Sequence, residues 1–228
     1  MKKNVKVGGA VVTVKGLIAE GANGFVYQGF TFTRSGGGRR PAAKVALKKI
    51  LCLDESGSRS AKREIDALSR FRHKNIVELL LWSVVENNSD RSDENYPHPY
   101  ALLVFPYCES SLESRVSNRG RLSCESALSV LRGICSAASF LHSRGCRHND
   151  IKPGNVLLRG SGGGDGEPIL TDFGSCGDCE ELVADRRQAL AAMDFYSRST
   201  TAPYRAPELW DIPSGAALTH KADAFSAG

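Results

Sequence analysis

The chain has 228 residues, 41% of them apolar, which is enough for one large domain or two small lobes with a packed core. Thirty Lys and Arg against 25 Asp and Glu give a formal net charge of +5. Because the basic residues are scattered, we expect no nucleic-acid-binding patch. The seven cysteines are odd in number and widely spread, which favours a reducing, cytoplasmic setting over a disulfide framework.

The sequence also argues against secretion and against membrane insertion. No segment approaches the roughly 18 uninterrupted apolar residues of a membrane-spanning helix. The opening residues MKKNVKVGGA contain no apolar signal region, and no glycine follows Met1 directly. We therefore expect no signal peptide, no transmembrane segment and no N-myristoyl anchor.

The first hundred residues are predicted to be mainly strands. Residues 11–32 carry β-branched and aromatic side chains on both sides of a glycine-rich turn, and residues 42–51 form a further apolar strand. The sequence RSGGGRRP, residues 34–41, is predicted to be the turn between them. Together these segments indicate a small antiparallel sheet.

One helix is predicted in this half. Residues 60–71 place Ile65, Leu68 and Phe71 at helical spacing, with Ser60 as the N-cap. Residues 86–99 are polar and contain prolines, so we expect an exposed loop between the apolar strands 79–85 and 100–107.

The second half is predicted to be helical from about residue 109. Ser123 is expected to cap a long helix ending near Gly145. Its predicted apolar stripe consists of Ala127, Leu128, Leu131, Ile134, Cys135, Ala138 and Leu141. Two short strands, 155–159 and 168–172, follow around a flexible glycine-rich loop. A strand-rich half joined to a helix-rich half predicts an α+β fold with a cleft between its two parts.

Several segments carry residues suited to phosphate chemistry. Residues 19–26, AEGANGFV, form a strand–turn–strand segment whose glycines would let backbone amides approach phosphates, although an ordinary hairpin turn is the alternative. Lys48 lies on the next strand and Glu64 on the first helix. The carboxylate could hold the lysine over nucleotide phosphates, and the alternative is a pair of surface charges.

The series is completed by three motifs later in the chain. His148-Asn149-Asp150-Ile151-Lys152-Pro153-Gly154-Asn155 is followed by Asp172-Phe173-Gly174 and then by Ala206-Pro207-Glu208. In this order, the glycine-rich turn, the lysine, the helix glutamate and the three motifs resemble the eukaryotic protein kinase domain over nearly the whole chain.

The resemblance implies a bilobal protein-kinase-like fold that binds ATP and Mg²⁺. Residues 1–108 would form the β-rich N-lobe and hinge, and residues 109–228 a helical C-lobe. The C-lobe is expected to be incomplete, since residues 223–228 resemble only the start of the family's floor helix. The implied nucleotide-binding residues are Ala19, Gly21, Gly24, Val26, Ala46, Lys48, Phe105, Tyr107, Cys108 and Leu157.

The resemblance also implies the roles of the reacting groups. Asp150 would orient the substrate hydroxyl and Lys152 would lie beside the transferred phosphoryl group, while Asn155 and Asp172 would hold Mg²⁺ through oxygen ligands. Lys48 and Glu64 would position the phosphates. Thr201 would bond to the aspartate and lysine and so favour serine or threonine in a protein substrate.

Within the kinases, the chain resembles the Numb-associated family, and most of all its Golgi-associated branch. The residues that carry this likeness are VALKKILC, AKREIDALSRFRHKNIVELL and the segment RRQALAAMDFYSRSTTAP before YRAPEL. The family implies a helical element from Arg187 to Tyr196, for which an ordered loop is the alternative. It also implies peripheral association with Golgi or vesicle membranes.

One residue departs from the kinase pattern. Asn149 occupies the place where an arginine usually precedes the catalytic aspartate and grips a phosphorylated activation loop. We expect this change to remove a switch and to leave the chemistry intact. The alternatives are a pseudokinase that binds nucleotide or partners without transfer, favoured by Ala19 and Asn149, and a truncated product that does not fold stably. The pair Cys176 and Cys179 is interpreted as incidental.

Overall fold

The computed structural model describes residues 3–21, 24–35, 38–86, 98–160 and 166–228. The chain divides into two compact units. The first contains Met1–Ser69 and Glu78–Tyr107, and the second contains Arg70–Val77 and Cys108–Gly228. The predicted α+β composition is confirmed, since the strands of the large sheet lie in the first unit and most helices lie in the second.

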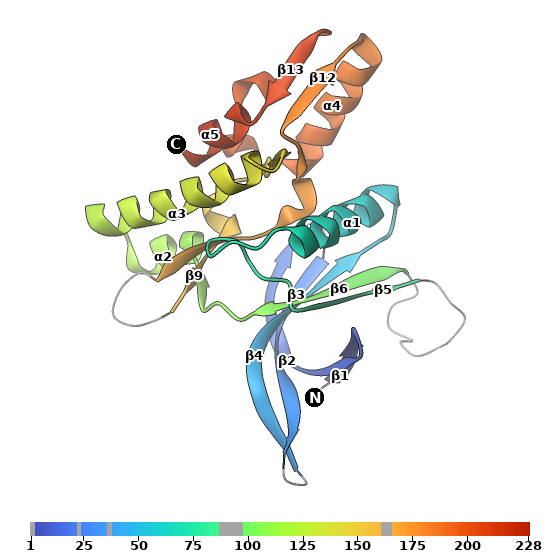
Figure 1. The fold of residues 1–228 in the computed structure, drawn as a ribbon, viewed down its shortest axis with the longest axis vertical. Helices are drawn as coiled ribbons and strands as arrows, with labels where there is room; N and C mark the ends of the chain where they lie inside the picture. The colour runs from blue at the N-terminus through green and yellow to red at the C-terminus, as the bar shows by residue number, and fades with distance from the viewer. Residues whose placement is uncertain (1–2, 22–23, 36–37, 87–97, 161–165) are drawn as a thin grey trace. The chain divides into compact units, whose positions relative to one another are not determined.

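The first unit is built on one antiparallel sheet with the strand order β1-β2-β3-β4-β6-β5 (Figure 1). Its elements are β1 (Lys3–Val7), β2 (Ala10–Gly21), β3 (Gly24–Ser35), β4 (Gly38–Leu51), α1 (Glu55–Arg70), β5 (Leu81–Val85) and β6 (Tyr100–Pro106). Strands β1 to β4 pair with their sequence neighbours through short connections, as is usual for antiparallel strands, whereas β4 pairs next with β6.

Strand β4 is central to this sheet and presents two different faces. Val45 and Leu47 are buried in a cluster with Val104 and other apolar residues of β1, β2 and β6. Because successive side chains of a strand point to opposite faces, Ala46 and Lys48 point to the other face. The alternation thus separates the residues that build the core from those predicted to meet nucleotide.

Two predictions for this unit, the extent of one turn and the cap of α1, are wrong in detail. The turn predicted at residues 34–41 is largely strand, with Arg34 paired to Arg39 and Ser35 to Gly38, because pairing satisfies backbone groups that a longer loop would leave to solvent. Residues 36–37 lie outside the described residues, as do residues 87–97, which form most of the predicted exposed loop.

Helix α1 begins at Glu55, so the prediction that Ser60 caps it is wrong. The carboxylate of Asp54 instead accepts the backbone N–H of Gly57 at 2.8 Å, as a capping residue does. The first turn is polar and its buried residues, which include Ala61, Glu64 and Leu68, all come later. The apolar pattern therefore marks only the second part of the helix.

The second unit contains four helices among the described residues, together with short strands and 3-10 turns. The helices are α2 (Leu112–Arg119), α3 (Cys124–His142), α4 (Arg186–Ser199) and α5 (Lys221–Ala227). The strands are β7 (Ser110–Ser111), β8 (Cys146–Arg147), β9 (Val156–Arg159), β10 (Glu167–Leu170), β11 (Gly177–Asp178), β12 (Glu180–Val183) and β13 (Ala216–Thr219). The 3-10 turns are η1 (Pro153–Asn155), η2 (Phe173–Ser175), η3 (Ala202–Tyr204) and η4 (Pro207–Leu209). The strands pair as β10-β9-β7, β11-β8 and β12-β13.

Helix α3 begins as predicted, and its buried face matches the predicted stripe only at Ile134, Ala138 and Leu141. The Ser123 hydroxyl accepts the N–H of Ser126 at 3.1 Å, which confirms the predicted cap. The buried residues are Val130, Gly133, Ile134, Ala137, Ala138 and Leu141. Leu128 and Leu131, predicted to be in the apolar stripe, are 60% and 41% exposed, and Ala127 and Cys135 are also exposed. Close packing of Gly133 against Pro168 on β10 sets the rotation of the helix.

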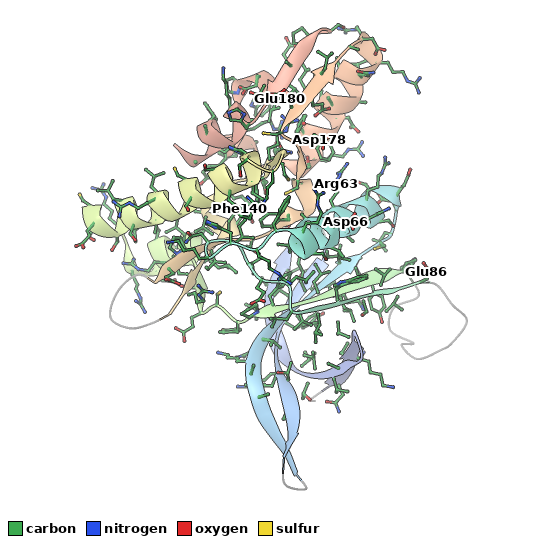
Figure 2. All side chains as sticks on the ribbon, in the orientation of Figure 1. Arg63, Asp66, Glu86, Phe140, Asp178 and Glu180 are labelled. Carbon is green, nitrogen blue, oxygen red and sulfur yellow. The ribbon has the colours of Figure 1, made fainter. Side chains whose placement is uncertain are left out.

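Near the end of α3, Phe140 contacts the segment that precedes β5 in sequence. Phe140 is labelled in Figure 2. Its ring lies 4.9 Å from that of His73 and 6.3 Å from that of Phe71. Among the described residues, α3 is the one helix whose length and composition would allow it to cross a membrane. A core helix of a soluble protein meets the same criterion, and α3 buries one face inside the second unit.

Helix α4 confirms the helical element predicted from Arg187 to Tyr196. Asp185 caps it by accepting the N–H of Gln188 at 2.8 Å. Its buried face packs into a second apolar cluster with residues of β12, η4, β13 and α5; the buried members are Val183, Ala189, Ala192, Tyr196, Ala206, Leu209, Ile212, Leu218 and Ala222. This cluster fixes the whole segment between β12 and α5.

Candidate active site

Lys48 on β4 and Glu64 on α1 form an ion pair inside the first unit. The Lys48 ammonium donates to both Glu64 oxygens, at 2.9 and 2.7 Å. The Glu64 carboxylate is 1% exposed, while the Lys48 side chain is 18% exposed. A buried carboxylate that holds a partly exposed ammonium presents a fixed positive charge to solvent, which is what a phosphate-binding lysine requires.

Apolar residues predicted to bind nucleotide lie near Lys48 in the sheet. Val26 is paired with Lys48 across β3 and β4, and Ala46 is paired with Phe105 across β4 and β6. The ring of Tyr107 is covered by the ammonium of Lys44 at 3.6 Å.

The glycine-rich turn joins β2 to β3. Gly21 pairs with Gly24, and Ala19 pairs with Val26. A Cβ on Gly24 would lie 1.9 Å from the carbonyl oxygen of Lys49, so this position needs glycine for strand packing whether or not a phosphate binds. Residues 22–23, at the tip, lie outside the described residues.

Asp150 lies in the second unit, in the loop between β8 and η1. One oxygen, Oδ1, accepts the backbone N–H of Thr201 at 2.8 Å. The other, Oδ2, accepts the Asn155 amide at 2.8 Å and lies 2.8 Å from the Lys152 ammonium. Three donors, two from the residues that follow Asp150 and one from the segment after α4, therefore fix the orientation of the carboxylate.

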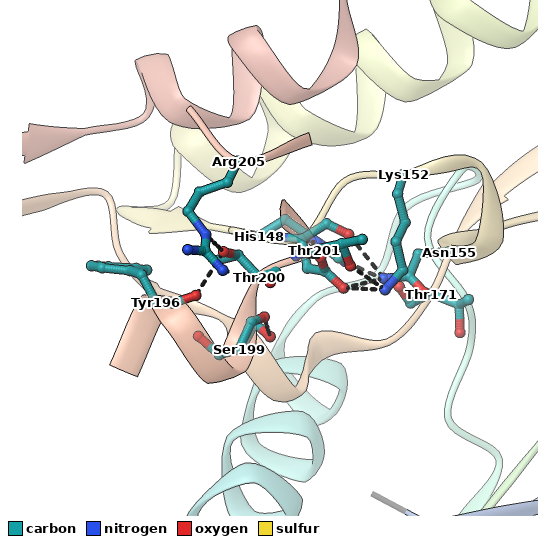
Figure 3. A network of polar contacts seen from close by, with 11 residues as sticks. His148, Lys152, Asn155, Thr171, Tyr196, Ser199, Thr200, Thr201 and Arg205 are labelled. Atoms are coloured by element: carbon teal, nitrogen blue, oxygen red, sulfur yellow. Dashed lines mark hydrogen bonds and ion pairs between the residues drawn. The ribbon is translucent and has the colours of Figure 1, made fainter. Parts of the chain in front are cut away.

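Thr201 and Lys152 complete this group, as Figure 3 shows. The Lys152 ammonium lies 2.6 Å from the Thr201 hydroxyl, so Thr201 bonds to Asp150 through its backbone and to Lys152 through its side chain. This is the contact that the sequence predicted. It ties the residue following α4 directly to the proposed reacting groups.

Asn155 and Asp172 are the predicted metal ligands. The Asn155 amide nitrogen donates to both the carbonyl and the carboxylate of Asp150, at 2.8 Å each, so its oxygen is the atom that can face a cation. Asp172 has a left-handed backbone, with φ of 67°. No group of three or more His, Cys, Asp or Glu gathers among the described residues. The two oxygens suit Mg²⁺, which takes its other ligands from water and substrate phosphates.

The last two predicted nucleotide-binding residues belong to the second unit. Leu157 lies on β9, paired with Ser111. Cys108 follows Tyr107 directly, and burial raises the pKa of its thiol. A thiol held neutral in this way is a weak nucleophile.

Asp223 on α5 anchors the loop that carries Asp150. Its two oxygens accept the backbone N–H groups of His148 and Asn149 at 2.8 Å each, and His142 lies 2.8 Å from Oδ2. Burial alone would raise the pKa of Asp223, but the contacts with His142, His148 and the two amides hold it below its ordinary value.

The sequence analysis missed Arg147, Glu181 and Tyr196. The Arg147 side chain is fully buried, and one of its nitrogens contacts the Glu181 carboxylate at 2.6 Å and the Tyr196 hydroxyl at 2.5 Å. The one available signal was an arginine two residues before the position where arginine is missing. Its partners lie 34 and 49 residues away in the chain, beyond the reach of any local pattern.

Comparison with known families decides what this arrangement belongs to. The family model described as "Protein kinase domain" matches residues 12–228. The chain belongs to the protein kinase family. The predicted kinase fold is thereby confirmed.

Curated relatives narrow the likeness. Serine/threonine-protein kinase 16 of Rattus norvegicus is 33% identical over 189 residues, covering 80% of this chain and 58% of the relative. The Homo sapiens protein of the same name is 32% identical over the same shares. A probable serine/threonine-protein kinase of Dictyostelium discoideum is 25% identical over 99% of this chain and 76% of the relative. The chain thus spans 58% of the length of the first two relatives. Their shared name, serine/threonine-protein kinase 16, is that of the kinase branch that the sequence was predicted to resemble most. Membership of the wider Numb-associated family stays a prediction.

Proposed function

We propose that this protein is an active serine/threonine kinase that transfers the γ-phosphoryl group of ATP to hydroxyl groups of proteins. The observation that carries the proposal is the Asp150 carboxylate, held by Asn155, Lys152 and the backbone of Thr201. A carboxylate has about four acceptor positions, so Asp150 can also accept the proton of a substrate hydroxyl.

The remaining charged groups meet the other needs of phosphoryl transfer, which are positioning and charge neutralisation. Lys152 would balance negative charge on the phosphoryl group beside Asp150. Lys48, held by Glu64, would bind the non-transferred phosphates. Mg²⁺, held by the oxygens of Asn155 and Asp172, would supply further positive charge at the phosphates.

The contacts of Thr201 support serine and threonine as acceptors. Its hydroxyl bonds to Lys152 and its backbone N–H bonds to Asp150. These bonds hold the segment around Thr201 close to Asp150, beside the place where the substrate hydroxyl would bind. The names of the relatives agree with this choice. An intracellular location and association with Golgi or vesicle membranes stay predictions from the sequence.

The test is transfer of labelled phosphate from MgATP to a serine/threonine peptide library by the full-length protein. Asp150→Asn and Lys48→Met should each lower turnover, by roughly 10²- to 10⁴-fold for the aspartate. Asp194→Asn is the matched control, because Asp194 is a 58% exposed carboxylate on α4, paired with Arg198 on the surface. That variant should retain wild-type turnover.

The second candidate is a pseudokinase, supported by Ala19 in the glycine-rich turn and by Asn149. It predicts that MgATP raises the melting temperature while phosphate transfer stays at the level of Asp150→Asn. Transfer clearly above that level decides for the active kinase.

A further inference from the structure

Arg147 is the largest side chain that is fully buried in the described residues. A buried guanidinium is costly unless charge and hydrogen bonds compensate for lost hydration. Here the compensation comes through a single nitrogen, Nη2, while Nε and Nη1 are buried without a hydrogen-bond partner in the part of the chain that the structure describes. The fold therefore keeps a charge that its interior only partly satisfies.

The partners of Arg147 lie near the two ends of the segment from β12 to Thr201. Glu181 lies on β12 and Tyr196 in the last turns of α4. The Tyr196 hydroxyl also donates to Glu181 at 2.7 Å, so the three groups form a closed triangle. Burial raises the pKa of the Tyr196 phenol, which keeps it a hydrogen-bond donor at all physiological pH values.

Tyr196 is connected to the reacting groups by a short path. Its carbonyl oxygen accepts the Thr200 hydroxyl at 2.7 Å and the Thr200 N–H at 3.1 Å. The next residue, Thr201, bonds to Asp150 and Lys152. Arg205 holds the same turn from outside through the Thr200 hydroxyl at 2.6 Å (Figure 3).

We propose that Arg147 is a positioning residue that, through Glu181 and Tyr196, holds residues 180–201 in the arrangement that places Thr201 on Asp150 and Lys152. The contacts of the Arg147 guanidinium with the Glu181 carboxylate and the Tyr196 phenol thus replace the contact that a phosphorylated loop would make with an arginine at the position of Asn149. The inference rests on the proposed kinase function, and it assigns the segment an ordered state that needs no phosphorylation.

The kinetic test compares Arg147→Met, Arg147→Lys, Glu181→Gln and Tyr196→Phe in the full-length protein. Misplacing Thr201 should lower kcat/KM for the peptide in Arg147→Met, on the order of tenfold to a hundredfold, while KM for ATP changes by less than about twofold. Arg147→Lys keeps a charged donor and should recover part of the loss. Tyr196→Phe removes one oxygen from a side chain of nearly the same volume, so it remains informative if Arg147→Met does not fold.

A second measurement does not depend on activity. Hydrogen exchange of residues 180–201 should accelerate in Arg147→Met and Tyr196→Phe, with exchange in α3 unchanged. Arg198→Met is the matched control, because Arg198 forms a surface pair with Asp194 at 2.8 Å on the same helix and is 69% exposed. It should leave both kinetics and exchange at wild-type values.

The outcomes separate this inference from the proposed function. An inactive wild-type protein whose segment still loosens in the Arg147 and Tyr196 variants refutes the kinase activity and retains the positioning role. Wild-type peptide kinetics and wild-type exchange in Tyr196→Phe and Glu181→Gln overturn the inference. So does an active enzyme that loses turnover on phosphatase treatment and regains it on rephosphorylation.

Discussion

Asn149 has a left-handed backbone conformation, with φ of 68°. For most residues with a Cβ this conformation costs roughly 1–2 kcal/mol, and Gly, Asn and Asp tolerate it best. The Asn149 amide also donates to the carbonyl of Ser175 at 2.8 Å. Asparagine therefore suits this position because it tolerates the left-handed backbone and bonds to Ser175. It also lacks the guanidinium that would bind a phosphate on the loop.

Substitution at Asn149 should separate these two contributions to stability. Asn149→Gly keeps the backbone conformation and loses the hydrogen bond, at a cost of about 0.5–1.5 kcal/mol. Asn149→Ala loses the bond and adds backbone strain, so its free energy of unfolding should be lower than that of the glycine variant by about 1 kcal/mol. Urea unfolding measures the difference. An alanine variant at least as stable as the glycine variant contradicts the strain argument.

For single residues, the sequence predicted which side chains contact one another in the candidate site better than it predicted backbone conformation or burial. The pairing of Lys48 with Glu64 and the contacts of Thr201 with Asp150 and Lys152 could be predicted because the order of the motifs resembles that of the kinase domain. The left-handed backbone at Asn149 and the burial of Arg147 depend on contacts with residues such as Ser175 and Tyr196 that are distant in sequence.

Helix α3 depends on a glycine in its interior. A Cβ on Gly133 would lie 2.3 Å from the Pro168 ring and 3.1 Å from the Asn75 amide, and that amide donates to the Pro168 carbonyl at 2.8 Å. The close approach of α3 to β10 therefore requires the absence of a side chain here.

Gly133→Ala should destabilise the protein although alanine is the better helix former. Overpacking costs about 1–3 kcal/mol and exceeds the gain of about 1 kcal/mol in helix propensity. Ser129→Ala, at an exposed position on the same helix, is the control and should be neutral or slightly stabilising. Thermal unfolding of both variants decides it: a Gly133→Ala melting temperature at or above that of Ser129→Ala would show that β10 moves aside without penalty.

The elements were predicted to different degrees. The Ser123 cap could be predicted because caps are local signals, and α4, which precedes Thr201, could be predicted from the family resemblance. The face that α3 buries could be predicted only in part, because leucines lie on both sides of the helix and the close contact at Gly133 selects the side. The start of α1 was missed because its first turn buries no large apolar residue.

In the molecule as a whole, Asp223 joins α5 to the catalytic loop and to the end of α3. Since its folded-state pKa lies below the ordinary value of 3.8, its contribution to stability is complete above that pH. The contribution is lost as the pH falls through the folded-state pKa. Acid should therefore loosen the loop that carries Asp150.

The test is the pH dependence of unfolding in Asp223→Asn. Near neutral pH the variant should be less stable than the wild type by about 1.5–3 kcal/mol, the value of hydrogen bonds to a charged group. The difference should stay constant down to about pH 4 and should shrink as the pH falls further through the folded-state pKa, where the wild-type carboxylate becomes protonated. Asp194→Asn serves as the exposed control. A gap that stays constant during this further fall in pH would mean that the charge of Asp223 contributes nothing.

The overall α+β organisation could be predicted because composition and periodicity change near residue 109. The sequence pointed to Asp223 only as the first residue of the segment 223–228, which resembles the start of the family's floor helix. Its bonds to the loop of Asp150 join residues more than seventy positions apart, and no pattern in a single sequence specifies such a pairing.

The alternation of β4 limits how the gene can vary. Val45 and Leu47 lie in the core, and Ala46 and Lys48 lie on the opposite face. Inserting or deleting one codon between Val45 and Lys48 would exchange the two sets, placing an ammonium in the apolar cluster and a core residue at the position predicted to bind phosphate. Insertions and deletions in β4 are therefore expected only at the ends of the strand, where they leave this alternation unchanged.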